Sequence, residues 1–189
     1  EINFSKVSSK CTFKYRKAFL NEIMGETGER SNDEDRKTCR KNFIKAINDN
    51  KIKGKSLEIY EIVKVVTNKD MKIFSKEEIK LFQNQWNVIK KDILAKIKSN
   101  EIDNFKFGNL LPIIDVSGSM YGTPLYVAIA LGLLLTEINS DDIKDKFITF
   151  SEKPQWINLS TEPNIVTKIE KTFRSEWGMN TDFEAVYNM

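Results

Sequence analysis

The chain has 189 residues, of which 40% are hydrophobic and 30% are charged, and its formal net charge is +3. This composition predicts one globular domain, or a small domain with a helical arm, and no apolar run reaches the roughly 18 residues that a transmembrane helix needs. Histidine is absent, which excludes Ser-His and Cys-His catalysis and histidine-ligated zinc within these residues.

The N-terminal segment has the apolar periodicity of helices. An apolar stripe from Phe13 to Ile23 predicts a first helix. Residues 25–35 are rich in Gly, Glu, Asn and Asp and indicate an exposed loop. A second helix is predicted to begin at Ser31, because Glu34 follows it three residues later in the spacing of a capping box.

Two more helices are expected before residue 100. Ser56 opens a short one, although its β-branched residues would also suit a strand. Ser75 and Glu78 form a second capping box, followed by apolar residues at steps of three and four: Ile79, Phe82, Trp86, Ile89, Ile93 and Ile97. This stripe predicts a regular helix that packs against its neighbours, with Trp86 in the core rather than in a binding site.

The pattern changes near Leu110 to alternating strands and helices, which is typical of an α/β sheet. The apolar residues before Asp115 predict a buried parallel strand. The further predicted elements are a buried helix from Leu125 to Ile138 with Pro124 in its first turn, a strand over 146–150, an edge strand or hairpin arm over 156–159, a helix over 164–173 and a last helix over 183–189.

Charge divides the chain at about the same place. Residues 1–108 carry 24 Lys and Arg against 16 Asp and Glu, whereas residues 109–189 carry 6 against 11. We therefore predict a basic helical region over 1–103 and the N-terminal part of an α/β domain over 104–189. The basic region suits the phosphates of RNA or an acidic partner, and the simpler interpretation is a solvated lysine-rich surface.

Three weaker features of the sequence bear on where the protein is located and where it comes from. Two cysteines are too few for a disulfide framework and favour an intracellular, cytoplasmic location. The sequence starts at Glu1 without a signal peptide, so we expect it to be part of a longer protein. Its abundant Lys, Asn and Ile hint at an AT-rich genome, such as that of a large DNA virus.

The residues with the most distinctive chemistry follow the first predicted strand. Asp115, Ser117 and Ser119 supply a carboxylate and two hydroxyls at the edge where open α/β sheets bind ligands, and Gly118 lets the backbone turn. Three interpretations fit: a capped turn, a phosphoryl-transfer site with Asp115 as nucleophile, and a site for a divalent cation such as Mg²⁺. The second is disfavoured because position 117 is not a carboxylate.

The motif Asp115-Val116-Ser117-Gly118-Ser119 resembles the first motif of the metal-ion-dependent adhesion site of von Willebrand factor A (vWA) domains. The segment Gly178-Met179-Asn180-Thr181-Asp182 resembles the later loop, in which Thr181 matches the threonine that binds the same metal. The resemblance implies an α/β fold with a Rossmann-like vWA open sheet, incomplete at the C-terminus and preceded by an all-α region. It also implies Mg²⁺, or Mn²⁺ or Ca²⁺, held by Ser117, Ser119 and Thr181 with support from Asp115. A third contribution, an aspartate after a later strand, is not reached by Met189.

A wider resemblance covers nearly the whole chain. Segments 115–120, 123–132, 148–154 and 177–183 are similar to an uncharacterised family of plants, fungi and large DNA viruses, in which a basic helical region precedes a vWA-like domain. Residues 15–20 and the pair Gln85-Trp86 resemble its upstream signatures. The order of the two regions is also similar to that of the Ro RNA-binding proteins, a likeness of architecture that does not establish function.

Four neighbouring residues have two interpretations each. Asp182 orients the waters of the metal or caps the helix that begins at Phe183. Tyr121 and Thr123 contact a ligand or pack at the rim of the loop. Glu152 follows a strand at the ligand-binding edge of the sheet and is otherwise an ordinary surface carboxylate.

These residues favour binding over catalysis. We expect a non-catalytic module of a larger protein, whose metal captures an acidic side chain of a protein partner, with no role for a membrane. The alternative is an RNA-binding or ribonucleoprotein scaffold that uses the basic helical region. A metal-dependent hydrolase or phosphotransferase ranks third, because histidine is absent and position 117 is a serine.

Overall fold

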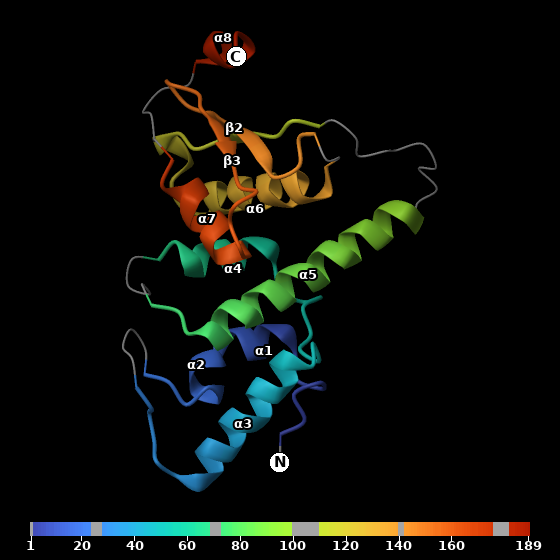
Figure 1. The fold of residues 1–189 in the computed structure, drawn as a ribbon, viewed down its shortest axis with the longest axis vertical. Helices are drawn as coiled ribbons and strands as arrows, with labels where there is room; N and C mark the ends of the chain where they lie inside the picture. Colours follow the sequence, from blue (N-terminus) through green and yellow to red (C-terminus); the bar gives the residue numbers. More distant parts are fainter. Residues whose placement is uncertain (1, 24–27, 69–72, 100–109, 140–141, 176–181) are drawn as a thin grey trace. The chain divides into compact units, whose positions relative to one another are not determined.

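A computed structural model describes residues 2–23, 28–68, 73–99, 110–139, 142–175 and 182–189 (Figure 1). The chain divides into two units. The first, called the helical unit, consists of Glu1–Glu58 and Asn68–Asn100. The second, called the α/β unit, consists of Ile59–Thr67 and Glu101–Met189. Among the described helices, none combines the length and the apolar character that crossing a bilayer requires.

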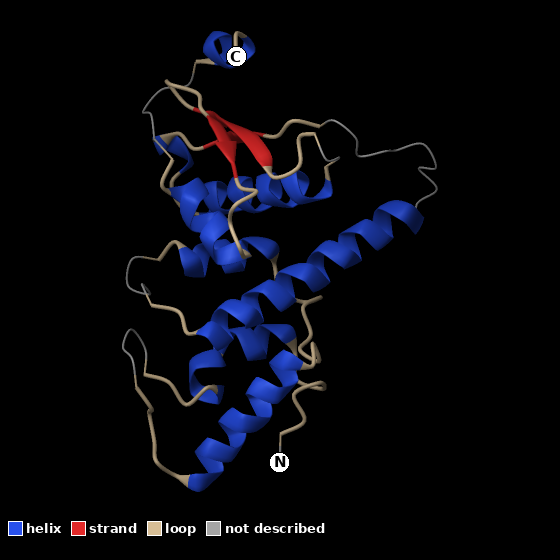
Figure 2. Cartoon of the chain, viewed as in Figure 1, coloured by secondary structure: helices blue, strands red, loops and turns tan. Residues whose placement is uncertain are grey.

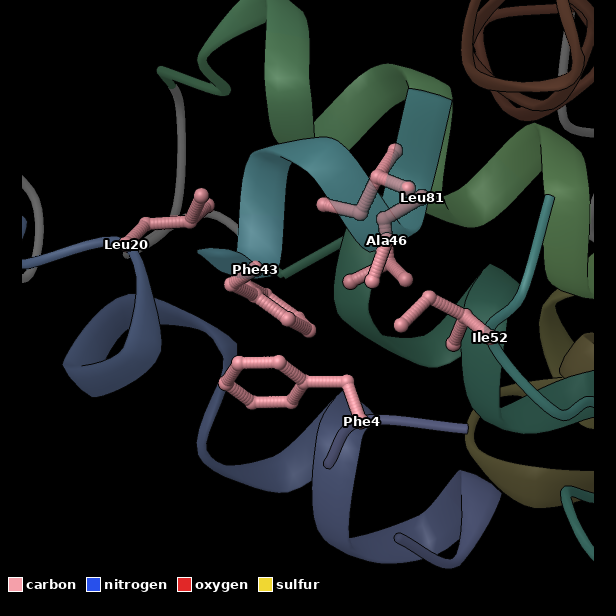
Figure 3. Packing of buried hydrophobic residues seen from close by; sticks show 7 residues of the cluster. Phe4, Leu20, Phe43, Ala46, Ile52 and Leu81 are labelled. Carbon is pink, nitrogen blue, oxygen red and sulfur yellow. The ribbon is translucent and has the colours of Figure 1, made fainter. Parts of the chain in front are cut away.

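The helical unit contains helices α1 (Ser9–Lys14), α2 (Arg16–Phe19), α3 (Glu34–Asn48) and α5 (Lys76–Ser99). Its apolar cluster joins the N-terminal segment to α3 and α5. The buried members are Phe4, Leu20, Phe43, Ala46, Ile47, Ile52 and Leu81. Figure 3 shows the Phe4 and Phe43 rings close together, and their centroids are 4.7 Å apart. Burial of these side chains therefore links segments that are distant in the sequence.

Two helix predictions in this unit are wrong. The predicted first helix is divided at Tyr15, which leaves helical geometry with φ −100° and ψ 15°, and Ile23 lies beyond α2. Ser31 does not open the second helix, because the Asn21 side chain binds both the backbone N–H and the carbonyl of Ser31. Helix α3 begins three residues later, with Asp33 at its N-cap.

The second capping box is confirmed. The backbone N–H of Ser75 donates to Glu78 Oε2 at 3.1 Å, and the N–H of Glu78 donates to Ser75 Oγ at 3.2 Å. Both groups would otherwise be unpaired at the start of α5, so this local pair fixes where the helix begins. Trp86 on the same helix is fully buried, as predicted for a core residue.

The α/β unit is a mixed α/β structure with a three-stranded sheet in the order β1-β2-β3 (Figure 2). Strand β1 (Ile113–Asp115) pairs in parallel with β2 (Lys146–Phe150), and β2 pairs in antiparallel fashion with β3 (Trp156–Asn158). Helix α6 (Thr123–Ile138) packs against β1 and β2, and α7 (Ile165–Phe173) packs against α6. The parallel pairing and the edge position of β3 agree with the sequence-based expectations.

Helix α4 (Ile59–Val66) packs against α6 and so belongs to the α/β unit, although it lies within the stretch predicted as basic helical region. The tight contact between α6 and β1 depends on Gly132. A Cβ atom at this position would lie 2.2 Å from Ile114 Cδ1, far inside the usual contact distance. Glycine therefore lets the helix approach the strand that leads into the candidate site.

The expectation of a fully buried first strand is wrong. Ile114 faces α6 and is 2% exposed, whereas Ile113 and Leu110 are 50% and 44% exposed. Successive side chains of a strand point to opposite faces, so Ile113 points away from α6. In the described part of the sheet, β1 is also an edge strand. Burial on one face alone explains why the apolar run is only partly enclosed.

Candidate metal centre at the ends of β1 and β2

The loop after β1 is held by its own polar groups. Asp115 is the last residue of β1, and its Oδ1 accepts a hydrogen bond of 2.9 Å from the backbone N–H of Ser117. The N–H of Val116 reaches the Phe150 carbonyl of β2 at 3.4 Å. A short 3₁₀ helix, η1 (Gly118–Met120), follows. The Asp115 side chain therefore closes the turn after β1, although no side-chain hydrogen bond caps η1. Within the described residues, the second oxygen of this carboxylate has no hydrogen-bond partner.

Two serine hydroxyls meet in this loop. Ser117 Oγ and Ser119 Oγ lie 3.0 Å apart. Ser117 is 2% exposed, whereas Ser119 is exposed to solvent. The pair therefore joins a hydroxyl fixed inside the protein to one that a ligand can reach. This convergence follows from the turn at Asp115, because the bond to the Ser117 N–H bends the chain back over the end of the strand.

Asp182 lies at the end of the neighbouring strand. Its backbone N–H donates to the Ser151 carbonyl, directly after β2, at 3.3 Å. Its Oδ1 accepts from the Ala185 N–H at 2.9 Å, so Asp182 is the N-cap of α8 (Phe183–Tyr187). The Phe183 ring packs edge-on against Phe150 of β2 at 6.3 Å. The capping interpretation of Asp182 is confirmed, and the tertiary structure places this residue at the same sheet edge as Asp115. Thr181 lies outside the described residues.

The oxygen groups of the loop fit a small hard cation. Mg²⁺ takes oxygen ligands at about 2.1 Å in octahedral geometry, which places adjacent oxygens about 3.0 Å apart. The two serine hydroxyls have this separation, which also suits a hydrogen bond between them. Within the described residues no three His, Cys, Asp or Glu side chains cluster as metal ligands. A cation at this loop would therefore depend on the hydroxyls, Asp115 and water.

The predicted ligand-binding residues Tyr121, Thr123 and Glu152 lie near the serine loop but are not part of it. Tyr121 follows η1 with 76% of its surface exposed, and Thr123 is the exposed first residue of α6. Glu152 is exposed in the turn between β2 and β3, next to the Ser151 carbonyl that holds Asp182. No hydrogen bond or ion pair of Glu152 occurs in the described structure. These side chains are accessible to a partner, and none of them is built into the serine loop.

A buried ion-pair network in the helical unit was not predicted. Glu78 is 0% exposed, and its carboxylate pairs with Arg16 Nε at 2.9 Å and with Lys17 Nζ at 2.8 Å. Burial lowers the pKa of Arg16, and Glu78 opposes this shift. Burial also lowers the pKa of Lys17, but the hydrogen bonds to Glu78 and Glu22 outweigh it and leave that pKa raised. Two cations of the basic region are therefore internal rather than available to a partner.

The sequence signal of this network was partial. The capping box identified Glu78, but no local pattern connects it to Arg16, which lies 62 residues earlier. The resemblance of residues 15–20 to an upstream family signature pointed to the same place without explaining it. The network shows that this signature contains residues with a structural role.

Comparison with known proteins gives two matches. Residues 109–189 match the sequence profile of a family described as "Domain of unknown function (DUF7788)". The whole chain aligns with "Uncharacterized protein L728" of Acanthamoeba polyphaga mimivirus, with 31% identity over 194 residues. The alignment covers 100% of this chain and 31% of the viral protein, so the chain spans about a third of that relative's length. No solved structure matches. The family match begins just before β1 and thus includes the whole candidate site.

Proposed function

We propose that the α/β unit is a Rossmann-like, vWA-type binding module. In this proposal the serine loop holds a divalent cation, Mg²⁺ or alternatively Mn²⁺ or Ca²⁺, and the cation captures an acidic side chain of a protein partner. Ser117 and Ser119 are direct ligands, Asp115 supports the bound water, and Thr181 is the further hydroxyl. The protein is then a recognition module within a larger chain rather than an enzyme.

The observation that carries the proposal is the pair of hydroxyls at the carboxyl end of β1. Their oxygens lie 3.0 Å apart, and the Asp115 carboxylate accepts the Ser117 N–H in the same turn. The Ser151 carbonyl holds the backbone of Asp182 at the adjacent strand. Because Mg²⁺ retains several waters when it has few protein ligands, a position remains for a carboxylate from outside.

Two substitutions of Asp115 separate a metal site from a capped turn. Asp115→Asn retains an oxygen that can accept from the Ser117 N–H but removes the charge, whereas Asp115→Ala removes both. Titration calorimetry of the chain with Mg²⁺ and Mn²⁺ should show heat of binding in the parent and its loss in both variants. A role in the turn alone predicts an undiminished metal response in Asp115→Asn, and that result would overturn the proposal.

Ser160 offers a matched control for Ser117. Its backbone N–H donates to Asn158 Oδ1 at 2.9 Å, the same local turn as at Asp115, but it lies after β3 at the opposite end of the hairpin. Ser117→Ala should weaken metal binding by about ten-fold or more, equal to at least 1.4 kcal/mol, and Ser160→Ala should leave it unchanged. Equal effects of the two changes would contradict direct ligation by Ser117.

RNA binding by the basic region remains the alternative. In its favour is the excess of positive charge over residues 1–108. Against it, Arg16 and Lys17 are buried and paired with Glu78. Binding of a single-stranded RNA that weakens steeply between low and physiological salt would support this alternative, and salt-insensitive binding would remove it.

A further inference from the structure

The helical unit contains a pocket that neither proposal above uses. A cavity of about 520 Å³ lies between the start of α1 and the segment before α4. Its charged and hydroxyl-bearing lining residues are Lys6, Lys53, Lys55, Ser8, Ser9 and Ser56. Small-molecule sites are commonly about 300–1,000 Å³. The pocket therefore has the size of a ligand site, and its polar lining contains cations and hydroxyls without a carboxylate.

The two walls of the pocket are fixed by Gln85 of α5. Its fully buried Nε2 donates to the Ser9 carbonyl at 3.3 Å and to the Lys53 carbonyl at 3.3 Å. Gly54 lies so close to α5 that an added Cβ would be 2.7 Å from Val88 Cβ. The segment that carries Lys53 and Ser56 is therefore packed against α5 without a ligand. This preorganisation reduces the entropic cost of binding.

The lysines of the pocket are incompletely neutralised. Lys55 Nζ pairs with Asp92 at 3.1 Å, but Asp92 also binds Lys96 at 3.0 Å. These two hydrogen bonds, with Lys96 first, lower the pKa of Asp92, so this carboxylate is shared between two lysines and does not serve Lys55 alone. Among the residues that the structure describes, Lys6 and Lys53 have no ion-pair partner. Lys6 and Lys53 thus give the pocket a net positive charge of about two.

The serine hydroxyls have protons left for a ligand. Ser9 Oγ and Ser56 Oγ lie 2.7 Å apart, and one of them donates to the other, so one proton of the pair is uncommitted. Ser9 Oγ also accepts the Ser56 N–H at 3.1 Å. Ser8 Oγ accepts the Cys11 N–H at 3.3 Å and has no acceptor for its proton in the described structure. The polar lining therefore offers hydrogen-bond donors and excess positive charge together.

We propose that this pocket binds the phosphate group of a small phosphomonoester or pyrophosphate compound. A multiply charged tetrahedral oxyanion accepts several hydrogen bonds and matches a site with ammonium and hydroxyl donors and no lining carboxylate. All lining residues belong to the helical unit, so the inference is independent of the cation site at Asp115.

Titration with inorganic pyrophosphate tests this site in the intact chain. Backbone amide signals of Ser9, Gly54 and Ser56 should shift with saturation in ¹⁵N correlation spectra, without divalent metal present. The double variant Lys6→Gln/Lys53→Gln should bind pyrophosphate about ten-fold or more weakly. The control Lys41→Gln/Lys76→Gln removes the same charge from exposed helical positions outside the pocket and should change affinity less than two-fold.

Two results would overturn the proposal: absence of saturable shifts at these amides, or equal weakening by the two double variants, which would indicate diffuse attraction by a basic surface. A competition arm identifies the source of the phosphate. Displacement of pyrophosphate by adenosine monophosphate but not by a single-stranded RNA without terminal phosphates supports a small phosphate compound. Displacement by that RNA alone would overturn the assignment to a small ligand.

Discussion

Glu78 and Asp115 are both carboxylates that bond to a backbone N–H in a turn with a serine, yet the structure uses them in different ways. Glu78 is fully buried and accepts from Arg16, Lys17 and the Ser75 N–H. Asp115 is partly exposed, accepts one bond from the loop and has no ion-pair partner in the described structure. We call the first a closed group, because it is buried and paired with charged groups inside the protein, and we expect it to contribute to stability. We call the second an open group, because it is partly exposed and has no ion-pair partner in the described structure. This difference is the reason to assign function to the loop of the α/β unit.

The largest expected effect is at the closed group. Glu78→Ala leaves two buried cations without their shared carboxylate and should destabilise the helical unit by about 3–5 kcal/mol. Urea unfolding followed by circular dichroism measures the loss. Glu77→Ala changes a partly exposed carboxylate in the same helical turn and should cost less than about 0.5 kcal/mol. A similar cost for both variants would break the distinction between closed and open carboxylates.

An intermediate effect is expected where α6 supports the open site. Gly132→Ala places a Cβ against Ile114 and should cost about 1–3 kcal/mol in the α/β unit through overpacking. In an Ile114→Ala background the same change should be neutral or stabilising, because alanine favours helix by about 1 kcal/mol once the clash is gone. Additive costs in this double-mutant cycle would show that the contact does not set the position of α6.

The smallest expected effect concerns a closed group in the α/β unit. Lys168 of α7 pairs with Asp145 at 2.6 Å and with Glu137 at 3.0 Å. Burial lowers its pKa, but these partners outweigh burial, so the pKa of Lys168 is raised in the folded state. Its contribution to stability is therefore complete below the unfolded-state pKa of about 10.4 and is lost as pH rises through the higher folded-state value.

Comparison with Lys168→Arg isolates this titration, because arginine keeps its charge over the same range. The difference in unfolding free energy between the two proteins should be constant from pH 7 to about 9.5 and should shift in favour of Lys168→Arg above about pH 10.5. Urea midpoints at each pH provide the measurement. A difference that does not vary with pH would show that Lys168 is not a closed, charge-paired group.

Features that depend on neighbouring residues were predictable. The capping box at Ser75 and Glu78, the strand at 146–150 and the helix after Asn164 are all present. The wrong prediction at Ser31 rested on a pattern of neighbouring residues, but it failed because of a contact with a residue farther away in the sequence. Ser31 has the spacing of a capping box, but the Asn21 side chain binds its backbone and keeps it in the loop. A hydrogen-bond partner ten residues away in the sequence thus prevents Ser31 from acting as the N-cap that its spacing to Glu34 predicts.

By itself the sequence determined the mixed α/β character, the position of the Asp115 loop and the three side chains that give this loop its chemistry. Only the tertiary structure decided that Glu78 neutralises Arg16, that α4 packs with the α/β unit and that Asp182 lies at the end of β2. The physical reason is range. Turns and helix ends are set by bonds between near neighbours, whereas burial and charge pairing depend on which distant segments the packed core brings together.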